Sequence, residues 1–254
     1  MKCCFVLDTV TGNWTVSVQD VIEAVRGSSV TINCTFSCPP VKCDASKENL
    51  NRWIGFWKKK ATIISTNLPK WKLPTKYRKR TLFLGNLQTH NCTMMLDGVR
   101  RTDTGPFYFR IELPQYGRSY SYTKNDVTID VMSNPPVPSL SVQVRDKITA
   151  SCSVSHSCPS YPPQFIWSHP GIVTLRSKKL NMWEWETVST VTLKPLPIDF
   201  NKNLTCTVKY RGGKQARNSH EETNLMGIPL SLYLFNQMIG LQEKPIPRSC
   251  YSSI

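Results

Sequence analysis

The sequence predicts an all-β protein with two β-sandwich domains in tandem. Many short runs alternate polar and apolar residues with a period of two, as in Ser29–Phe36, and stretches of helical periodicity are hard to find. Proline-rich Asn134–Pro138 interrupts these runs, because prolines do not continue a central strand. Comparable series of cysteines and tryptophans stand on both sides of it. We therefore expect domains over residues 13–133 and 134–227.

The two ends of the chain fit neither domain. Residues 1–12 contain Lys2 and a short apolar run, Cys3–Leu7, typical of the remnant of a secretory signal peptide. In the unassigned tail 228–254, the apolar run Ile228–Leu241 falls short of the roughly 20 residues that a membrane-spanning helix needs. Membrane attachment is therefore expected only through an anchor that this sequence lacks.

Ten cysteines and four Asn-x-Ser/Thr sequons indicate an extracellular protein. The cysteines lack the paired Cys-x-x-Cys pattern of a zinc site, so disulfides formed in an oxidising compartment explain them better. Sequons beside such cysteines favour the secretory route. The sequence thus predicts the outer face of the plasma membrane, or secretion. The expected glycosylation sites are Asn13, Asn33, Asn91 and Asn203.

The chain is strongly basic, with a net charge of 32 − 17 = +15 at pH 7. Its lysines and arginines gather in two runs, Lys58–Lys60 and Lys76–Arg80. Solvated loops and strand edges are the simplest explanation, since lysine at an edge discourages unwanted strand pairing. The alternative is a polyanion binder for a ligand such as heparan sulfate. Nucleic acid is not an expected partner, because the sequence has neither a basic helix nor an aromatic sheet motif.

The second half carries the cysteine and tryptophan spacing of an immunoglobulin-like sandwich. Trp167 follows Cys152 by 15 residues, and Cys206 follows Trp167 by 39. In immunoglobulin domains such cysteines join strands B and F, and the tryptophan of strand C packs on their disulfide. We expect a C2-type domain with a Cys152–Cys206 disulfide. The usual tyrosine two residues before the second cysteine is Leu204 here.

The first half repeats this pattern with one change. Cys34 and Trp57 suit strands B and C of a variable-type domain, and Asp103–Phe107 resembles the start of its strand F motif. The final cysteine of that motif is replaced by Phe109. Cys34 therefore needs another partner, and Cys92 on the preceding strand E is the candidate, since strands B and E are neighbours in one sheet.

These features together resemble the Siglecs, the sialic-acid-binding immunoglobulin-like lectins. The resemblance covers Trp14 to Gly227, and its specific parts are Leu84–Leu87 before Asn91-Cys-Thr, Tyr108-Phe-Arg110, and Cys152…Cys158-Pro…Trp167. Siglecs have an intrasheet B–E disulfide in the first domain, which agrees with a Cys34–Cys92 pair. The resemblance also implies that Arg110, on strand F, is the essential arginine that binds the sialic acid carboxylate.

The resemblance implies aromatic contacts to the sugar as well. In Siglecs an aromatic residue of strand A contacts the glycerol chain of sialic acid, and Trp14 fits that role. A second aromatic, on strand G, packs on the sugar, and Tyr120 or Tyr122 is the candidate. The alternatives are structural roles for the aromatic residues and, for Arg110, an ordinary surface pair with Glu112.

Siglecs also join their first two domains by a disulfide. Cys158 lies where the cysteine of the second domain is expected, but no cysteine stands just before Cys34. Either Cys38 or Cys43 could pair with Cys158, and we favour Cys38–Cys158. In the alternative, Cys38 and Cys43 pair with each other and Cys158 stays free. With the favoured pairing, Cys43 and Cys250 have no assigned partner.

The sequence therefore predicts the ectodomain of a sialic-acid-binding adhesion receptor, with sialylated glycoproteins or glycolipids as partners. The alternative is an immunoglobulin-family domain for protein–protein adhesion or immune co-reception without glycan binding. An enzyme is not expected, because the four histidines are scattered and the sequence has no HExxH, Gly-x-Ser-x-Gly, P-loop or Rossmann pattern. No metal or cofactor is implied.

Overall fold

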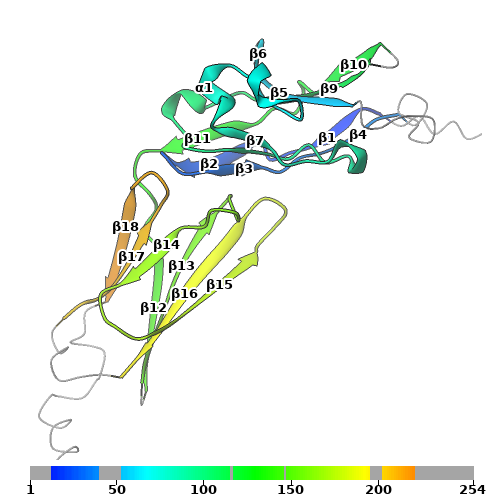
Figure 1. Cartoon of the computed structure of the whole chain (residues 1–254). Coiled ribbons are helices and arrows are strands. Elements are labelled where there is room, and N and C mark those ends of the chain that lie inside the picture. Colours follow the sequence, from blue (N-terminus) through cyan, green and yellow to red (C-terminus); the bar gives the residue numbers. More distant parts are fainter. Residues whose placement is uncertain (1–12, 40–52, 115–116, 146, 195–201, 221–254) are drawn as a thin grey trace, which may run out of the picture.

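The structure is a computed structural model that describes residues 13–39, 53–114, 117–145, 147–194 and 202–220 (Figure 1). It consists mostly of β-strands in sheets, which confirms the predicted all-β, immunoglobulin-like class. Strands up to β11 (Thr128–Met132) pair only with one another, and so do the strands from β12 (Ser139–Val144) onward. The expected boundary at 133/134 lies between these two strands. Residues 1–12, Cys43 and the tail with Cys250 lie outside the described residues.

One sheet of the first domain has four antiparallel strands in the order β10-β9-β5-β6, with β10 at the edge. Strand β6 beside β5 is a feature of variable-type domains. On β9, buried and half-buried residues alternate, which is the pattern of a strand with one face on the core. The strands are β5 (Ile54–Lys59), β6 (Thr62–Thr66), β9 (Tyr108–Leu113) and β10 (Arg118–Ser121).

The opposite layer of the first domain contains a three-stranded sheet in the order β3-β8-β7, and β1 pairs there with β4 in antiparallel orientation. Strand β2 pairs in parallel with β11. A bridge between Phe107, just before β9, and Val127, just before β11, links this pair to the first sheet. These strands are β1 (Thr15–Ser17), β2 (Val21–Val25), β3 (Val30–Ile32), β4 (Thr35–Ser37), β7 (Thr81–Phe83) and β8 (Met94–Leu96). The short helical connections are η3 (Lys70–Lys72), α1 (Thr75–Arg78), η4 (Leu87–Thr89) and η5 (Arg101–Asp103).

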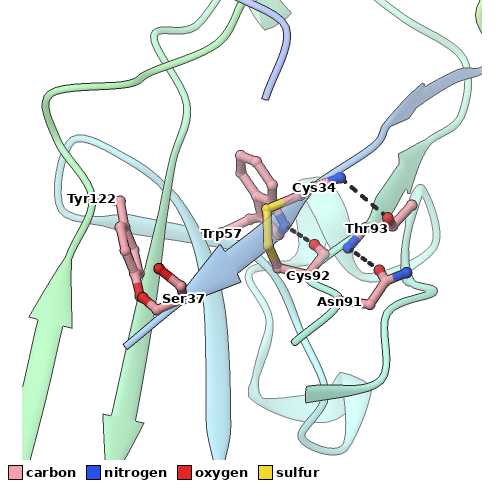
Figure 2. Close-up of a disulfide and its surroundings, with 7 residues drawn as sticks. All are labelled: Cys34, Ser37, Trp57, Asn91, Cys92, Thr93 and Tyr122. Carbon is pink, nitrogen blue, oxygen red and sulfur yellow. Dashed lines mark hydrogen bonds between the residues drawn. A yellow bond between two sulfur atoms is a disulfide. The ribbon is translucent and has the colours of Figure 1, made fainter. Parts of the chain in front are cut away.

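A disulfide between Cys34 and Cys92 lies in this second layer, as the sequence predicts (Figure 2). The two residues stand beside the paired strands β3 and β8, and the Cys92 amide donates to the Cys34 carbonyl at 2.8 Å. Trp57 is 1% exposed and donates its indole N–H to the Cys92 carbonyl at 2.7 Å. Phe109, 1% exposed, fills the core where a cysteine of strand β9 would otherwise stand.

The second domain is a sandwich of a four-stranded and a three-stranded sheet. Their orders are β12-β13-β16-β15 and β14-β17-β18, the arrangement of constant-type immunoglobulin domains. The Cys152–Cys206 disulfide joins β13 to β17 across the two sheets, and half-buried Trp167 packs in the same core. The remaining strands are β13 (Ile148–His156), β14 (Gln164–Trp167), β15 (Ile172–Lys179), β16 (Trp185–Leu193), β17 (Leu204–Lys209) and β18 (Gln215–His220).

The preferred pairing of Cys38 with Cys158 is wrong. Cys158 is a buried free thiol, and burial raises its pKa. Cys38 is disulfide-bonded, but not to Cys158. The residue that faces Cys158 from the first domain is Thr31, whose hydroxyl donates to the Cys158 sulfur at 3.5 Å. A threonine on β3 therefore occupies the position from which a cysteine would close an interdomain disulfide.

Near Thr31 and Cys158, the two domains also meet through other noncovalent contacts. Arg211 forms an ion pair with Asp97 at 2.9 Å, and Gly27 packs directly against Gly212. Gly212 has a φ of +90°, and a Cβ there would come within 2.6 Å of the Gly27 Cα. A glycine is required at that position by both its backbone conformation and its close approach.

Candidate functional site

Arg110 projects from the outer face of strand β9. Phe109 and Ile111, its neighbours along the chain, are 1% and 0% exposed and belong to the core. Since successive side chains of a strand point to opposite faces, the burial of these two residues directs Arg110 outward. The arginine itself is half-buried.

Three hydrogen bonds hold the guanidinium of Arg110. Its Nε donates to Glu112 Oε1 at 2.9 Å. Its Nη1 and Nη2 donate to the hydroxyls of Ser121 and Ser119 at 3.0 and 2.7 Å. The two serines lie on β10, directly across the ladder from Arg110 and Glu112 respectively. Because a guanidinium has five N–H donors, one on each terminal nitrogen is not used by these bonds.

The ion pair with Glu112, which an ordinary surface arginine would form, is therefore present. The side chains of Arg110 and Glu112 are 28% and 36% exposed, so solvent screens their attraction. Exposed pairs of this kind contribute about 0.2–1 kcal/mol. The pair therefore contributes little to the stability of the fold.

Trp14 and Tyr120 form a parallel aromatic stack at the rim of the first sandwich. Their ring centroids are 4.7 Å apart and the ring planes differ by 5°. Trp14 stands just before β1 and Tyr120 is on β10, so the stack joins the first strand to the sheet edge. Both residues are half-buried and pack on the hydrophobic core.

Arg110 and Tyr120 lie on different faces of the same hairpin. Residues directly opposite in an antiparallel pair share a face, and Tyr120 stands opposite core residue Ile111. Tyr120 therefore points to the inner face at its open rim, whereas Arg110 lies on the outer face. Since β10 is the edge of its sheet, a ligand that touches both must cross the free edge of β10.

Tyr122 is not available to a ligand. It is 3% exposed, stacks on Phe109 and donates its hydroxyl to the Ser37 carbonyl at 2.9 Å. Burial, and then the neighbouring Tyr120, raise the pKa of Tyr122. Of the two tyrosines considered for strand G, only Tyr120 is thus at the surface. Tyr122 lies in the core and supports the stack, because its ring and the ring of Tyr120 are in edge-to-face contact.

Ser119 and Ser121 are not among the site residues predicted from the sequence. The sequence pattern that could have indicated them is a serine on each side of Tyr120. This spacing of two residues places both hydroxyls on the same face of a strand. Serine is common in loops and strands alike, so the pattern alone does not indicate a site. The pairing of β10 with β9, which places the two serines opposite Arg110 and Glu112, is needed to identify them.

The predicted glycosylation sites differ in their surroundings. Asn13 and Asn203 are exposed. Asn33 is half-buried and its amide donates to the Met182 carbonyl at 3.3 Å. Asn91 is half-buried too, and its side-chain oxygen accepts from the Thr93 amide at 2.9 Å. Glycosylation stays a prediction at all four positions.

No group of metal-binding side chains occurs among the described residues. In the same part of the chain, no helix has the length and apolar character needed to cross a membrane.

No family model matches the chain, but several curated proteins do. It is 28% identical to human sialic acid-binding Ig-like lectin 5 over 234 residues, which is 89% of this chain and 41% of that protein. It is 25% identical to mouse sialic acid-binding Ig-like lectin 12, over 86% of this chain and 47% of the relative. Mouse myeloid cell surface antigen CD33 is 25% identical over 75% of this chain and 47% of its own length.

The chain thus spans less than half the length of these relatives. Several relatives that match most of this chain are sialic acid-binding Ig-like lectins, which supports the predicted resemblance to the Siglec family. Since these relatives are lectins and a surface antigen, they agree with the expectation that the chain is not an enzyme.

Proposed function

We propose that the chain is the ectodomain of a sialic-acid-binding lectin that binds the sialate carboxylate through Arg110. The observation that carries this proposal is the arrangement of the Arg110 guanidinium. It is held by β9 and β10 beside a free sheet edge, and one N–H on each terminal nitrogen is not used by its hydrogen bonds.

The chemistry of the ligand fits this group. Sialic acid carries a carboxylate that is ionised at neutral pH, and the planar fork of an arginine can meet both of its oxygens. Hydrogen bonds to charged groups contribute roughly 1.5–3 kcal/mol. Millimolar binding corresponds to only about 4 kcal/mol. One arginine can therefore supply a large part of the affinity of a single weak site.

The rest of the sugar would lie across the edge of β10. The backbone N–H and C=O groups of that edge can bond to hydroxyl and amide groups of the ligand, as sheet edges do in peptide recognition. Beyond the edge, Trp14 and Tyr120 offer aromatic surface for apolar parts of the sugar. The stack covers one face of each ring, so the ligand would use the other faces and the ring edges.

Such a site is suited to a cell surface. Weak single contacts become useful when many receptors and many glycans meet, because linked sites bind with high effective concentration. We infer that the partners are sialylated glycoproteins or glycolipids, and that the protein acts at the outer side of the plasma membrane or after secretion. In sequence pattern alone the two domains also look similar to the N-terminal pair of the myelin-associated glycoprotein, a likeness that the relatives above do not test.

A solution titration tests the proposal. The secreted, glycosylated protein is titrated with sialyllactose, with lactose as the neutral control ligand. We expect millimolar or tighter binding of sialyllactose only, and no detectable binding by the Arg110→Ala variant with an unchanged melting temperature. Equal binding of both ligands, or full binding by the variant, would overturn the assignment.

One observation favours a second function, protein–protein adhesion without glycan binding. Glu112 already satisfies part of Arg110, as expected for an ordinary surface pair. Neuraminidase treatment of target cells separates the two functions. Binding of multimerised protein should disappear after treatment if it is a lectin, and should persist if the partner is a protein surface.

A further inference from the structure

A second charged surface lies elsewhere on the first domain. Between Trp53 and Asp103 the chain has eleven lysines and arginines but only two acidic residues, Asp97 and Asp103. This excess includes both basic runs, Lys58–Lys60 and Lys76–Arg80. The proposed sialic acid site uses none of these residues.

The fold brings the two basic runs to one place, the short helix η5. Lys59 donates its Nζ to the Thr102 carbonyl at 2.8 Å. The next residue, Asp103, is ion-paired with Arg80, and Lys76 Nζ lies 3.9 Å from its other carboxylate oxygen. Segments that are about 20 residues apart in the sequence therefore present their cations side by side.

The acidic residues of this region do not neutralise its surface. Asp103 is 0% exposed and offsets only Arg80 and, at the longer distance of 3.9 Å, Lys76. Asp97 is engaged by Ser29 and by Arg211 of the second domain. We call the resulting exposed cations the basic surface: Lys60, Lys70, Lys72, Lys76, Arg78, Lys79, Arg100 and Arg101.

The basic surface rests on a well-anchored segment. Between β6 and β7, Leu73 and Tyr77 are both 3% exposed and fix the chain to the core. The guanidinium of Arg78 donates to the carbonyls of Leu73 and Trp71, at 3.1 and 3.2 Å. These contacts fix the backbone that carries the lysines between β6 and β7, which lowers the entropy lost on binding.

Trp71 adds a flat apolar element among the charges. Its side chain is 69% exposed, and Lys72 Nζ lies 5.4 Å from the ring centroid. An exposed indole between cations suits a ligand that alternates anionic groups with sugar rings, because the ring can pack on an apolar sugar face. Trp71 is the one strongly exposed aromatic among the described residues of this segment, whereas insertion into a lipid surface normally uses several apolar side chains.

We propose that the basic surface binds a sulfated polysaccharide of the heparan sulfate type. Disulfides and sequons indicate an extracellular protein, and sulfate groups carried on sugar rings match both the fixed cations and the exposed indole. This binding is separate from the Arg110 site and does not depend on the sialic acid proposal.

Binding to a size-defined heparin oligosaccharide tests the proposal. The parent is compared with a variant in which Lys70, Lys72, Lys76 and Lys79 are changed to glutamine. The matched control changes four exposed basic residues of other regions to glutamine: Lys147, Arg176, Lys179 and Arg217. Affinity is measured over a salt series, and thermal melting checks that every variant is folded.

The basic-surface variant should lose affinity by on the order of tenfold or more, and its salt dependence should weaken by about one unit of logarithmic slope for each engaged lysine. The control should lose less than about threefold. Trp71→Ala should weaken binding most clearly at high salt, where ionic attraction is screened. Arg110→Ala should leave heparin binding unchanged.

Three results would overturn the proposal. Equal losses in the two fourfold variants would mean that only net charge matters. Loss of heparin binding in Arg110→Ala, with none in the basic-surface variant, would assign polyanions to the other site. Tighter binding of anionic lipid vesicles or single-stranded RNA than of heparin, with the same lysine dependence, would replace the polysaccharide by a different ligand class.

Discussion

Glu112 should limit the affinity of Arg110 for an external carboxylate. It accepts a 2.9 Å hydrogen bond from the arginine Nε and places a negative charge beside the proposed ligand position. Glu112→Gln keeps an oxygen acceptor for the Nε but removes the charge. Glu112→Ala removes both, so the two variants separate repulsion from orientation.

The size of the effect follows from the exposure of the pair. Two carboxylates sharing one guanidinium would lie roughly 6 Å apart, where their repulsion is about 0.7 kcal/mol in water and about 3 kcal/mol at an effective dielectric of 20. The 28% and 36% exposures of the Arg110 and Glu112 side chains place the site near the weak end of this range. We expect Glu112→Gln to tighten sialyllactose binding about two- to fivefold.

The assay is a titration of sialyllactose against the parent, Glu112→Gln and Glu112→Ala, at about 0.05 and about 0.5 M salt, concentrations chosen to bracket strong and weak screening. The gain in the glutamine variant should shrink at high salt, and the alanine variant should gain less. If the glutamine and alanine variants lose affinity equally, the carboxylate is needed to hold Arg110 and the repulsion argument is wrong.

Two further predictions concern the disulfide pattern and the aromatic cluster. Thr31→Cys should create an interdomain disulfide, because the Thr31 hydroxyl lies 3.5 Å from the Cys158 sulfur. Non-reducing peptide mapping should then link position 31 to Cys158. Two alkylatable thiols in the unfolded variant would contradict this prediction. Tyr122→Phe should lower the free energy of unfolding by about 0.5–1.5 kcal/mol through the lost bond to Ser37, without changing sialoside affinity. Tyr120→Ala should instead weaken sialoside binding about two- to tenfold, and the opposite pattern would exchange the roles of the two tyrosines.

The sequence predictions that agree with the structure rest on the alternation of inward and outward side chains along a strand. On β9 the buried positions of Phe109 and Ile111 direct Arg110 outward, and a missing cysteine at 109 leaves Cys34 to pair with Cys92. These inferences needed only the period of a strand and the order of strands in an immunoglobulin sandwich.

The features that the sequence did not predict depend on strand register and on contacts between segments that are distant in the sequence. The choice between Tyr120 and Tyr122 depends on how β10 pairs with β9, and that register is set by the hairpin between them. The proximity of Thr31 to Cys158 arises across a domain junction, so no spacing along the chain indicates it. The meeting of two basic runs at η5 is likewise a property of packing, because Thr102 and Asp103 belong to neither run.

The most direct test of the central claim is a sialoglycan array probed with multimerised parent, Arg110→Lys and Arg110→Ala proteins. The claim predicts that the parent binds sialylated glycans but not their desialylated counterparts. Arg110→Ala should lose this binding, and Arg110→Lys should lose most of it, because an ammonium cannot form the bidentate fork. Retention of the parent pattern by the folded alanine variant would show that Arg110 does not bind the sialate carboxylate.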